Sequence, residues 1–316
     1  MDSIRSDKCF IAGHRGMVGS AIFRKLKFNK KYEIITAERS ELNLVNQLQV
    51  SEFFQMNKPS VVILAAAKVG GIRINRTKQA DFLYENLMIQ NNVLHSAAKS
   101  GVKKILFLGS SCIYPREAPQ PILEEYLMHG PLEPTNEGYA LAKISGLKLA
   151  QFYSESYGMK CICPMPCNLY GTNDNFDKNN SHVLAALVRR FVDAVEESKD
   201  CEMLWGTGEA MREFLHVDDA AEAFLLLLEK WDSSHHVNVG SGKDISIKDL
   251  AMKVAYLAGY KGDITWENSP QENGMPRKLL DVSKVTKLKF KPKISLDDGI
   301  MQMIEIYKNS KIIHNN

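Results

Sequence analysis

Three regularly spaced glycines follow the first apolar segment of the chain, and they limit its possible folds more than any other feature. Lys8 to Ala12 is a short apolar run typical of a buried strand, and residues 20–26 have the apolar spacing of a helix. Between them lies Gly13-His-Arg-Gly-Met-Val-Gly19. A strand, a glycine-rich turn and a helix in this order favour dinucleotide binding, because backbone can approach a pyrophosphate there. The spacing differs from Gly-x-Gly-x-x-Gly, so a plain glycine-rich turn stays open on this pattern alone.

Strand and helix patterns alternate along the first half of the chain. Further buried strands are predicted over residues 32–35, 60–67, 104–108 and 160–164, with a helix over 81–100 and another around Tyr139. This alternation predicts an α/β fold with a Rossmann-type, doubly wound parallel sheet and right-handed crossovers.

The chain changes character near Gly171, where polar loops become frequent. Helices are expected near 183–197 and 218–230, a strand over 236–239, and capping boxes at Ser246 and Ser295. We therefore expect a nucleotide-binding domain over 1–170, joined by a segment near 215–245, and a smaller α+β substrate-binding domain over 171–316. The last residues, 308–316, are expected to fray.

Composition excludes several classes of protein. The 316 residues are 45% hydrophobic and 24% charged, and the net charge of +3 is too small to indicate a nucleic-acid partner. No apolar run reaches about 18 residues, so no membrane span is expected, and the polar N-terminus lacks a signal-peptide core. Six irregularly spaced cysteines fit neither a disulfide framework nor a zinc site, so we expect no metal and a cytoplasmic location with reduced thiols.

The end of the second predicted strand bears on the choice between NAD and NADP. A carboxylate here, such as Glu38, would bind the adenosine ribose of NAD. Arg39, together with Arg15 in the glycine loop, could instead hold the 2′-phosphate of NADP. We favour NADP, with NAD as the alternative.

A tyrosine and a lysine lie four residues apart in Glu133-Pro-Thr-Asn-Glu-Gly-Tyr-Ala-Leu-Ala-Lys143. In a helix, this spacing places Tyr139 and Lys143 on one face, one turn apart. A neighbouring cation favours the phenolate form, so the pair could exchange a proton with a carbonyl substrate near neutral pH. On its own, the pattern also fits an ordinary helical face.

Five motifs together resemble the extended short-chain dehydrogenase/reductase family. They are Gly13-x-x-Gly16-x-x-Gly19, Leu64-Ala-Ala-Ala67, Gly109-Ser-Ser111, Tyr139-x-x-x-Lys143 and Arg212-Glu-Phe-Leu-His-Val-Asp218. Longer segments resemble the GDP-L-fucose synthase branch of that family and cover nearly the whole chain. These segments are Phe10–Ser20, Ala65–Gly71, Gly109–Pro115, Asp174–Phe176, Ser181–Val183 and Pro276–Asp281.

The resemblance implies a two-part reaction on GDP-4-keto-6-deoxy-D-mannose. C3 and C5 are epimerised, and NADPH then reduces the C4 ketone to give GDP-L-fucose. Cys112 and His182 match the base and acid that move the C3 and C5 protons. Tyr139, assisted by Ser110, would hold and protonate the C4 oxygen, while Lys143 would lower the pKa of Tyr139 and bind the nicotinamide ribose.

The resemblance also implies binding residues and a homodimer that uses the helix carrying Tyr139. The cofactor would be bound by Gly13, His14, Arg15, Gly16, Met17, Val18, Gly19, Arg39, Ala65, Ala66, Lys143, Pro166, Asn168, Leu169 and His182. The GDP moiety would be bound by Arg190, Trp205, Arg212 and, in a closing loop, Asp281.

The chain departs from the expected family pattern at three places. Cys167 stands where Thr is expected, Gly138 where Pro is common, and Thr172-Asn173 where Pro-His is expected. None of these changes removes a group that the reaction needs.

Other functions remain open on single residues. In isolation, Cys112 fits a small buried apolar residue and His182 a loop or cap residue. The alternatives are a UDP-sugar 4-epimerase, which needs no C3/C5 base, and a nucleotide-sugar dehydratase, which would carry an Asp-Glu pair in place of Cys112-Ile113. A more distant alternative is a non-catalytic NADP sensor, which would be expected to lack the tyrosine or the lysine.

Overall fold

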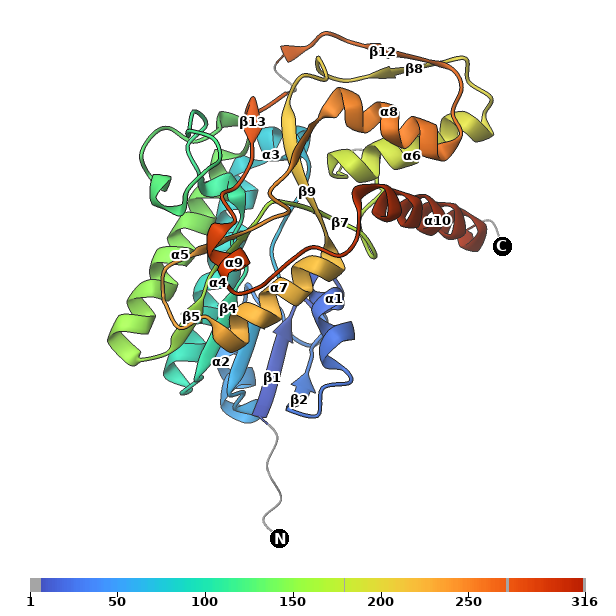
Figure 1. Cartoon of the computed structure of the whole chain (residues 1–316). Helices are drawn as coiled ribbons and strands as arrows, with labels where there is room; N and C mark the ends of the chain where they lie inside the picture. The colour runs from blue at the N-terminus through green and yellow to red at the C-terminus, as the bar shows by residue number, and fades with distance from the viewer. Residues whose placement is uncertain (1–6, 179, 271–272, 315–316) are drawn as a thin grey trace.

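The sheet at the centre of the first half has five parallel strands in the order β2-β1-β3-β4-β5 (Figure 1). The computed structural model describes residues 7–178, 180–270 and 273–314. This strand order, with the reversal beside β1, confirms the predicted doubly wound α/β fold. The strands are β1 (Asp7–Ala12), β2 (Tyr32–Ile35), β3 (Val61–Leu64), β4 (Lys104–Phe107) and β5 (Lys160–Ile162).

Helices cover both faces of this sheet. On one face α1 (Met17–Leu26) lies along α7 (Val217–Lys230), and on the other α4 (Gln79–Lys99) lies along α5 (Glu137–Tyr157), with α2 (Gln47–Asn57) beside α4 (Figure 1). The residues of β3 are all buried, as are those of β4 from Ile105 onward. Burial on both faces explains why these strands are continuous apolar runs rather than alternating ones.

The second half builds its own hydrophobic core. Helices α6 (Val183–Glu196), α8 (Ile247–Ala258) and α10 (Leu296–His314) pack together, and β8 (Cys201–Leu204) pairs in parallel with β12 (Asp263–Trp266). Strand β9 (Met211–His216) connects this core to the rest of the chain. It pairs with β7 (Asn168–Tyr170), β11 (Asp244–Ser246) and β13 (Arg277–Lys278).

Segments from the second half also pack against the first core. Residues of α7, of β10 (Val237–Val239, paired with β6, Pro164–Pro166) and of α9 (Ser283–Lys287) belong to the cluster built around the five-stranded sheet. This packing agrees with the expectation that a segment near 215–245 joins the nucleotide-binding part. The exact division into domains stays a prediction.

Three expectations about local structure were wrong. The third strand ends at Leu64 rather than at residue 67, and two helices, α2 and α3 (Ile72–Thr77), were not predicted. Only Val50 and Phe54 are buried in α2, so its apolar pattern is too sparse to read. Residues 308–314 are helical rather than frayed, because Tyr307 and Lys311 both bind Asp193 on α6 and hold the last turns of α10.

Both serines of the predicted capping boxes cap their helices, and each aspartate binds the serine hydroxyl instead of the serine N–H of a full capping box. The Ser246 hydroxyl accepts a hydrogen bond from the Asp249 N–H at 2.9 Å and donates to its carboxylate at 2.6 Å. Ser295 and Asp298 repeat this arrangement at the start of α10. Each pair satisfies backbone donors that the first turn of a helix leaves unpaired.

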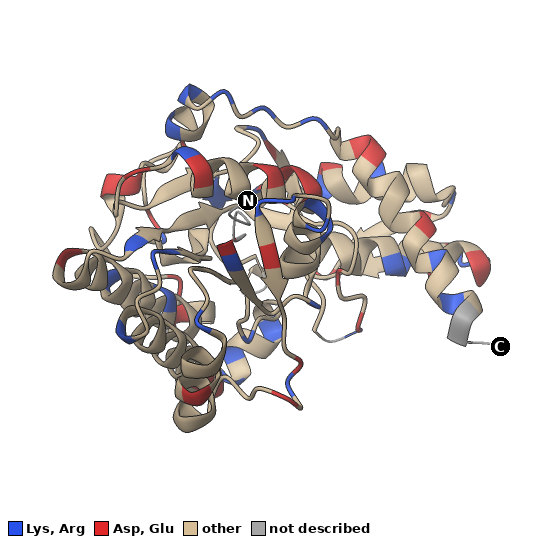
Figure 2. Cartoon of the chain, turned by 90° about the horizontal axis from the view of Figure 1, so that it is seen from below, with Lys and Arg blue, Asp and Glu red and all other residues tan. Residues whose placement is uncertain are grey.

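Charged side chains of both signs are interspersed over the elements seen from below (Figure 2). Among the described residues, no helix is both long enough and apolar enough to cross a membrane.

The glycine turn after β1 requires glycine at position 19 for packing. A Cβ at Gly19 would lie 2.1 Å from the Gly13 carbonyl oxygen, whereas a Cβ at Gly16 would lie 3.5 Å from the same atom. We predict that Gly19→Ala lowers the free energy of unfolding by about 1–3 kcal/mol, because backbone has to move. Chemical denaturation measures this, with Gly16→Ala as the matched control. Equal effects of the two substitutions would contradict the prediction.

Candidate active site

A pocket of about 400 Å³ lies between the carboxyl edge of the parallel sheet and the second core. Both halves of the chain line it, as expected for a site that joins a cofactor to a substrate. Fourteen of the predicted site residues share this one pocket. They are Met17, Val18, Ala65, Ser110, Cys112, Tyr139, Lys143, Pro166, Asn168, Leu169, His182, Arg190, Trp205 and Arg212.

Ser110, Tyr139 and Lys143 form a connected group at the floor of the pocket. Ser110 follows β4 and its hydroxyl hydrogen-bonds to the Tyr139 phenol. Lys143 lies one turn further along α5, with its Nζ 5.8 Å from the centre of the Tyr139 ring, and it donates a hydrogen bond of 2.8 Å to the Leu108 carbonyl. The Lys143 side chain is therefore fixed to the carboxyl end of β4.

The expected lowering of the tyrosine pKa by the lysine is not what the structure shows. Burial raises the pKa of Tyr139 above its ordinary value, the nearby Cys112 raises it further, and only the Ser110 hydrogen bond lowers it. Burial also lowers the pKa of Lys143 to about 8. Loss of water opposes the charged form of both groups, and this effect outweighs their mutual attraction. The phenol is therefore a neutral hydrogen-bond donor near pH 7.

Cys112 and His182 enter the pocket from different elements. Cys112 lies in the short 3-10 turn Ser111–Ile113, and its N–H donates to Ser110 Oγ at 3.2 Å. His182 is the residue before α6, and burial lowers the pKa of its imidazole. A thiol and an imidazole thus share one pocket with the tyrosine.

The glycine loop has the geometry of an anion cradle. Gly13 has a φ of +86°, and a Cβ there would lie 2.7 Å from the Ala66 nitrogen in the loop after β3. The N-terminus of α1, at Gly16, has neither a side-chain cap nor an acidic residue in its first turn. Its free N–H groups and positive dipole end fit the pyrophosphate of a dinucleotide.

The two arginines proposed for a 2′-phosphate are exposed and do not line the pocket. Arg15, the candidate for the phosphate of NADP, forms an ion pair with Glu38, the candidate for the ribose of NAD. Arg39 is exposed beside them. The Glu38 carboxylate is already occupied by a cation, which weakens it as a ribose ligand and leaves a phosphate able to compete for Arg15.

Two arginines and a tryptophan form the opposite end of the pocket. Arg190 donates to Glu202 at 2.7 Å, and Arg212, which is 9% exposed, donates to the Asn273 carbonyl at 2.7 Å. Burial lowers the pKa of Arg212 to about 10, so it stays cationic at neutral pH. Two guanidinium groups contact the Trp205 ring, with Arg73 Cζ 3.5 Å and Arg190 Cζ 5.3 Å from its centre.

Asp281 is not brought into the pocket. Its carboxylate accepts hydrogen bonds from the N–H and hydroxyl of Ser283, at 3.0 and 2.5 Å, and so organises the start of α9. Its predicted role in a closing loop stays a prediction.

Sequence reasoning missed several lining residues. Arg73 belongs to the unpredicted helix α3, and Asn136 and Lys278 approach Cys112 from distant segments. Lys278 lies within the Pro276–Asp281 segment, so position alone signalled its importance.

Gly138, which departs from the expected proline, has a specific partner. Its N–H donates to Gln79 Oε1 at 2.9 Å, and Gln79 Nε2 donates to the Pro134 carbonyl at 2.8 Å. A Cβ at position 138 would lie 2.6 Å from the Gln79 carbonyl oxygen. Gln79 therefore fixes the start of the helix that carries Tyr139.

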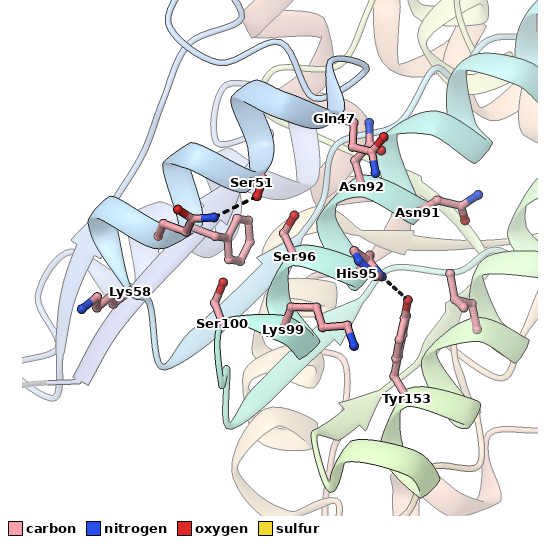
Figure 3. A pocket seen from close by; sticks show the side chains of 13 residues that line it. Gln47, Ser51, Lys58, Asn91, Asn92, His95, Ser96, Lys99, Ser100 and Tyr153 are labelled. Atoms are coloured by element: carbon pink, nitrogen blue, oxygen red, sulfur yellow. Dashed lines mark hydrogen bonds between the residues drawn. The ribbon is translucent and has the colours of Figure 1, made fainter.

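A second cavity, of about 620 Å³, lies on the other side of the sheet between α2, α4 and α5 (Figure 3). It is lined mainly by amides, hydroxyls and lysines, and His95 contacts the Tyr153 hydroxyl there at 2.7 Å. None of the predicted site residues lines it. Within the described ranges, no cluster of three or more His, Cys, Asp or Glu side chains could hold a metal ion.

Comparison with known proteins agrees with this geometry. The model of the NAD dependent epimerase/dehydratase family matches residues 9–240. A putative GDP-L-fucose synthase 2 of Arabidopsis thaliana is 53% identical over 96% of this chain and 92% of the relative. The chain belongs to the NAD dependent epimerase/dehydratase family. The resemblance to the GDP-L-fucose synthase branch is thereby confirmed.

Other members of the epimerase/dehydratase family extend the comparison. The GDP-L-fucose synthase of Escherichia coli (strain K12) is 48% identical and covers 93% of this chain and 94% of its own. A GDP-mannoheptose C4 reductase of Campylobacter jejuni with NADP bound is 38% identical, has a TM-score of 0.87, and covers 96% of this chain and 98% of its own.

The buried Lys143 gives a pH-dependent stability. Its pKa is about 8 in the folded chain and about 10.4 when unfolded, so the unfolded chain binds more protons between these values and the free energy of unfolding rises with pH. Lys143→Met removes this rise. The wild type should therefore gain about 2–3 kcal/mol in free energy of unfolding between pH 7 and pH 10 that Lys143→Met does not gain.

Denaturant titrations at the two pH values measure this difference. Ile144→Met, on the same helix, adds no titratable group and serves as the control, with a pH-independent difference from the wild type. A constant difference for Lys143→Met as well would show that burial does not perturb the lysine.

Proposed function

We propose that the chain epimerises GDP-4-keto-6-deoxy-D-mannose at C3 and C5 and reduces its C4 ketone with NADPH to give GDP-L-fucose. The observation that carries the proposal is the presence of Cys112 and His182 in the same pocket as Ser110, Tyr139 and Lys143. A reductase needs only the last three. The additional thiol and imidazole supply the acid–base pair that epimerisation requires.

The ketone makes epimerisation chemically accessible. C3 and C5 flank the C4 carbonyl, so removal of either proton leaves the electron pair in an enolate with its charge on the C4 oxygen. Ser110 and Tyr139 can donate hydrogen bonds to that oxygen as the charge develops. Cys112 as thiolate takes the proton from one face, and His182 as imidazolium returns one to the other. Burial weakens the hold of His182 on its proton, which makes it a stronger donor.

Reduction uses the same oxygen contacts. NADPH supplies the hydride to C4 when it is bound. Tyr139, kept neutral by burial, then donates its proton to the oxygen that was the ketone. Lys143, fixed by the Leu108 carbonyl, keeps a positive charge beside the phenolate that forms.

The two ends of the pocket suit the remaining parts of both ligands. The loop from Gly13 to Gly19 would hold the NADPH pyrophosphate, and Arg15 with Arg39 the 2′-phosphate. Arg190 and Arg212 would bind the GDP diphosphate, with Trp205 against the base or sugar. The reductase of Campylobacter jejuni described above contains NADP, which supports this choice of cofactor.

The decisive assay follows oxidation of NADPH with GDP-4-keto-6-deoxy-D-mannose as substrate. We predict NADPH oxidation with a GDP-L-fucose product, and a loss of about 10²–10⁴-fold in Tyr139→Phe, because the proton donor is removed. Tyr153→Phe, on the same helix but outside the pocket, serves as the matched control. UDP-galactose is the control substrate. Conversion of UDP-galactose without any NADPH oxidation would favour a UDP-sugar 4-epimerase instead.

The epimerisation step is tested separately with Cys112→Ser. We predict that deuterium incorporation from D₂O at C3 and C5 falls by at least about 10²-fold, because a hydroxyl is a much weaker base than a thiolate. Ketone reduction should persist and give an unepimerised product. Loss of reduction with normal deuterium incorporation would contradict these roles.

We further propose that the chain acts as a homodimer in the cytoplasm. Helices α4 and α5 lie side by side and expose large apolar side chains, including Tyr84, Leu141, Phe152 and Tyr157. Such a face is typical of a helical interface.

The six unpaired cysteines are compatible with a reducing compartment.

The dimer proposal predicts a change of mass in solution. Phe152→Glu should give a monomer in sedimentation experiments, because it buries a charge in the proposed interface. Met56→Glu, at another exposed apolar residue, on α2, should leave the mass unchanged. A wild-type monomer would refute the proposal.

A further inference from the structure

Two side chains from distant parts of the chain donate hydrogen bonds to the sulfur of Cys112. Asn136 Nδ2 lies 3.4 Å from Sγ, and Lys278 Nζ lies 3.6 Å from it. Asn136 precedes α5, and Lys278 belongs to β13, so three separate segments converge on one sulfur atom. An amide N–H and an ammonium group stabilise a thiolate better than a thiol.

Few groups other than the Cys112 sulfur are placed to balance the positive charge of the Lys278 ammonium. The residue is 8% exposed, and among the described residues no carboxylate lies within ion-pairing distance of it. A buried cation without an anionic partner is unfavourable. An anionic sulfur at Cys112 would provide that partner.

The backbone around Lys278 is held on both sides. In the parallel pairing of β13 with β9, the backbone of Lys278 lies opposite the backbone of Arg212. The next two N–H groups donate to Gln120 Oε1 at 2.9 Å and to Glu213 Oε2 at 3.0 Å. This anchoring keeps the ammonium pointed at the sulfur instead of at solvent.

Other groups that face the sulfur favour the same ionisation state. The Arg212 guanidinium interacts electrostatically with Cys112, while Tyr139 is a neutral phenol. Glu133 also lines the pocket, but one of its oxygens accepts hydrogen bonds from Thr135 and the other lies 3.2 Å from Arg116. The net charge around the sulfur is therefore positive.

We propose that Lys278 and Asn136 are positioning residues that hold Cys112 as a thiolate and aim it at the substrate. This inference rests on the proposed function for its role in epimerisation. In that step a C–H bond of the sugar breaks, its proton forms S–H on Cys112, and its electron pair enters the enolate. Lys278 stays protonated throughout, so it changes the basicity of sulfur without exchanging a proton.

The test measures how fast iodoacetamide alkylates Cys112, since only the thiolate reacts appreciably. Peptide mass spectrometry separates Cys112 from the exposed Cys201. We predict that Lys278→Met slows alkylation at pH 7 by about tenfold or more, while Lys278→Arg keeps the rate within about threefold. Arg277→Met, the neighbouring exposed cation on β13, is the matched control and should alkylate at the wild-type rate.

Asn136→Asp provides an independent variant. The Asn136 side chain makes no capping hydrogen bond to α5, so the helix should still form in this variant, but the carboxylate would repel the thiolate. We predict alkylation slower by about tenfold here too. Rates within twofold of the wild type in both Lys278→Met and Asn136→Asp would overturn the proposal.

Kinetics with the sugar nucleotide separate this inference from the proposed function. Lys278→Met should lower the rate of deuterium incorporation at C3 and C5 in the NADP⁺-bound enzyme and leave KM nearly unchanged. A raised KM with normal alkylation would make Lys278 a substrate ligand and overturn the inference. If Lys278→Met slows alkylation but the wild type has no activity on the sugar nucleotide, the result would support the inference and count against the proposed reaction.

Discussion

The parallel pairing of β1, β3 and β4 is the constraint on which the site depends. In parallel strands the carboxyl ends meet at one edge, and the register sets Ala12 beside Leu64 and Leu64 beside Phe107. The glycine loop, the loop after β3 and the segment from Leu108 to Cys112 therefore begin at the same level. The Lys143–Leu108 hydrogen bond then ties α5 to that edge. Proposed catalytic groups that lie far along the chain from the glycine loop become its neighbours in this way.

Strand β9 has the corresponding role for the second half. Its Glu213 side chain is fully buried and accepts hydrogen bonds from the N–H groups of Gly242 and Leu280, at 2.6 and 3.0 Å. These bonds join the strand carrying Arg212 to the segment carrying Lys278. A buried carboxylate that binds two backbone N–H groups makes this junction rigid. The proposed diphosphate ligand and the proposed thiolate partner are thus held by one local structure.

The sequence predicted the elements whose patterns are local. Strand β2 and helices α6 and α7 lie within one residue of their expected bounds, because apolar spacing and capping residues mark them. Helix α3 has no such pattern, so Arg73 and its contact with Trp205 could not be foreseen. The approach of Asn136 and Lys278 to Cys112 depends on three chain segments meeting, which no spacing rule reports.

The protonation of Tyr139 was also beyond local reasoning. The four-residue spacing correctly predicted that the lysine lies one turn away, but it says nothing about how much water reaches either group. Desolvation acts on both residues, and its size depends on how the whole fold packs around them. The residues proposed to react could be picked out from the sequence, whereas their charge states required the fold.

The Gln79 fork between Pro134 and Gly138 limits which residues position 138 can hold. The glutamine oxygen needs an N–H donor at position 138, which a proline cannot supply, and the close approach of the two backbones leaves no room for a Cβ there. A homologue with proline at the second position therefore has to solve the same contact differently on α4. The carbonyl that excludes a Cβ belongs to the backbone of Gln79, so the need for glycine at position 138 comes from the packing of the two backbones and not from the glutamine side chain alone.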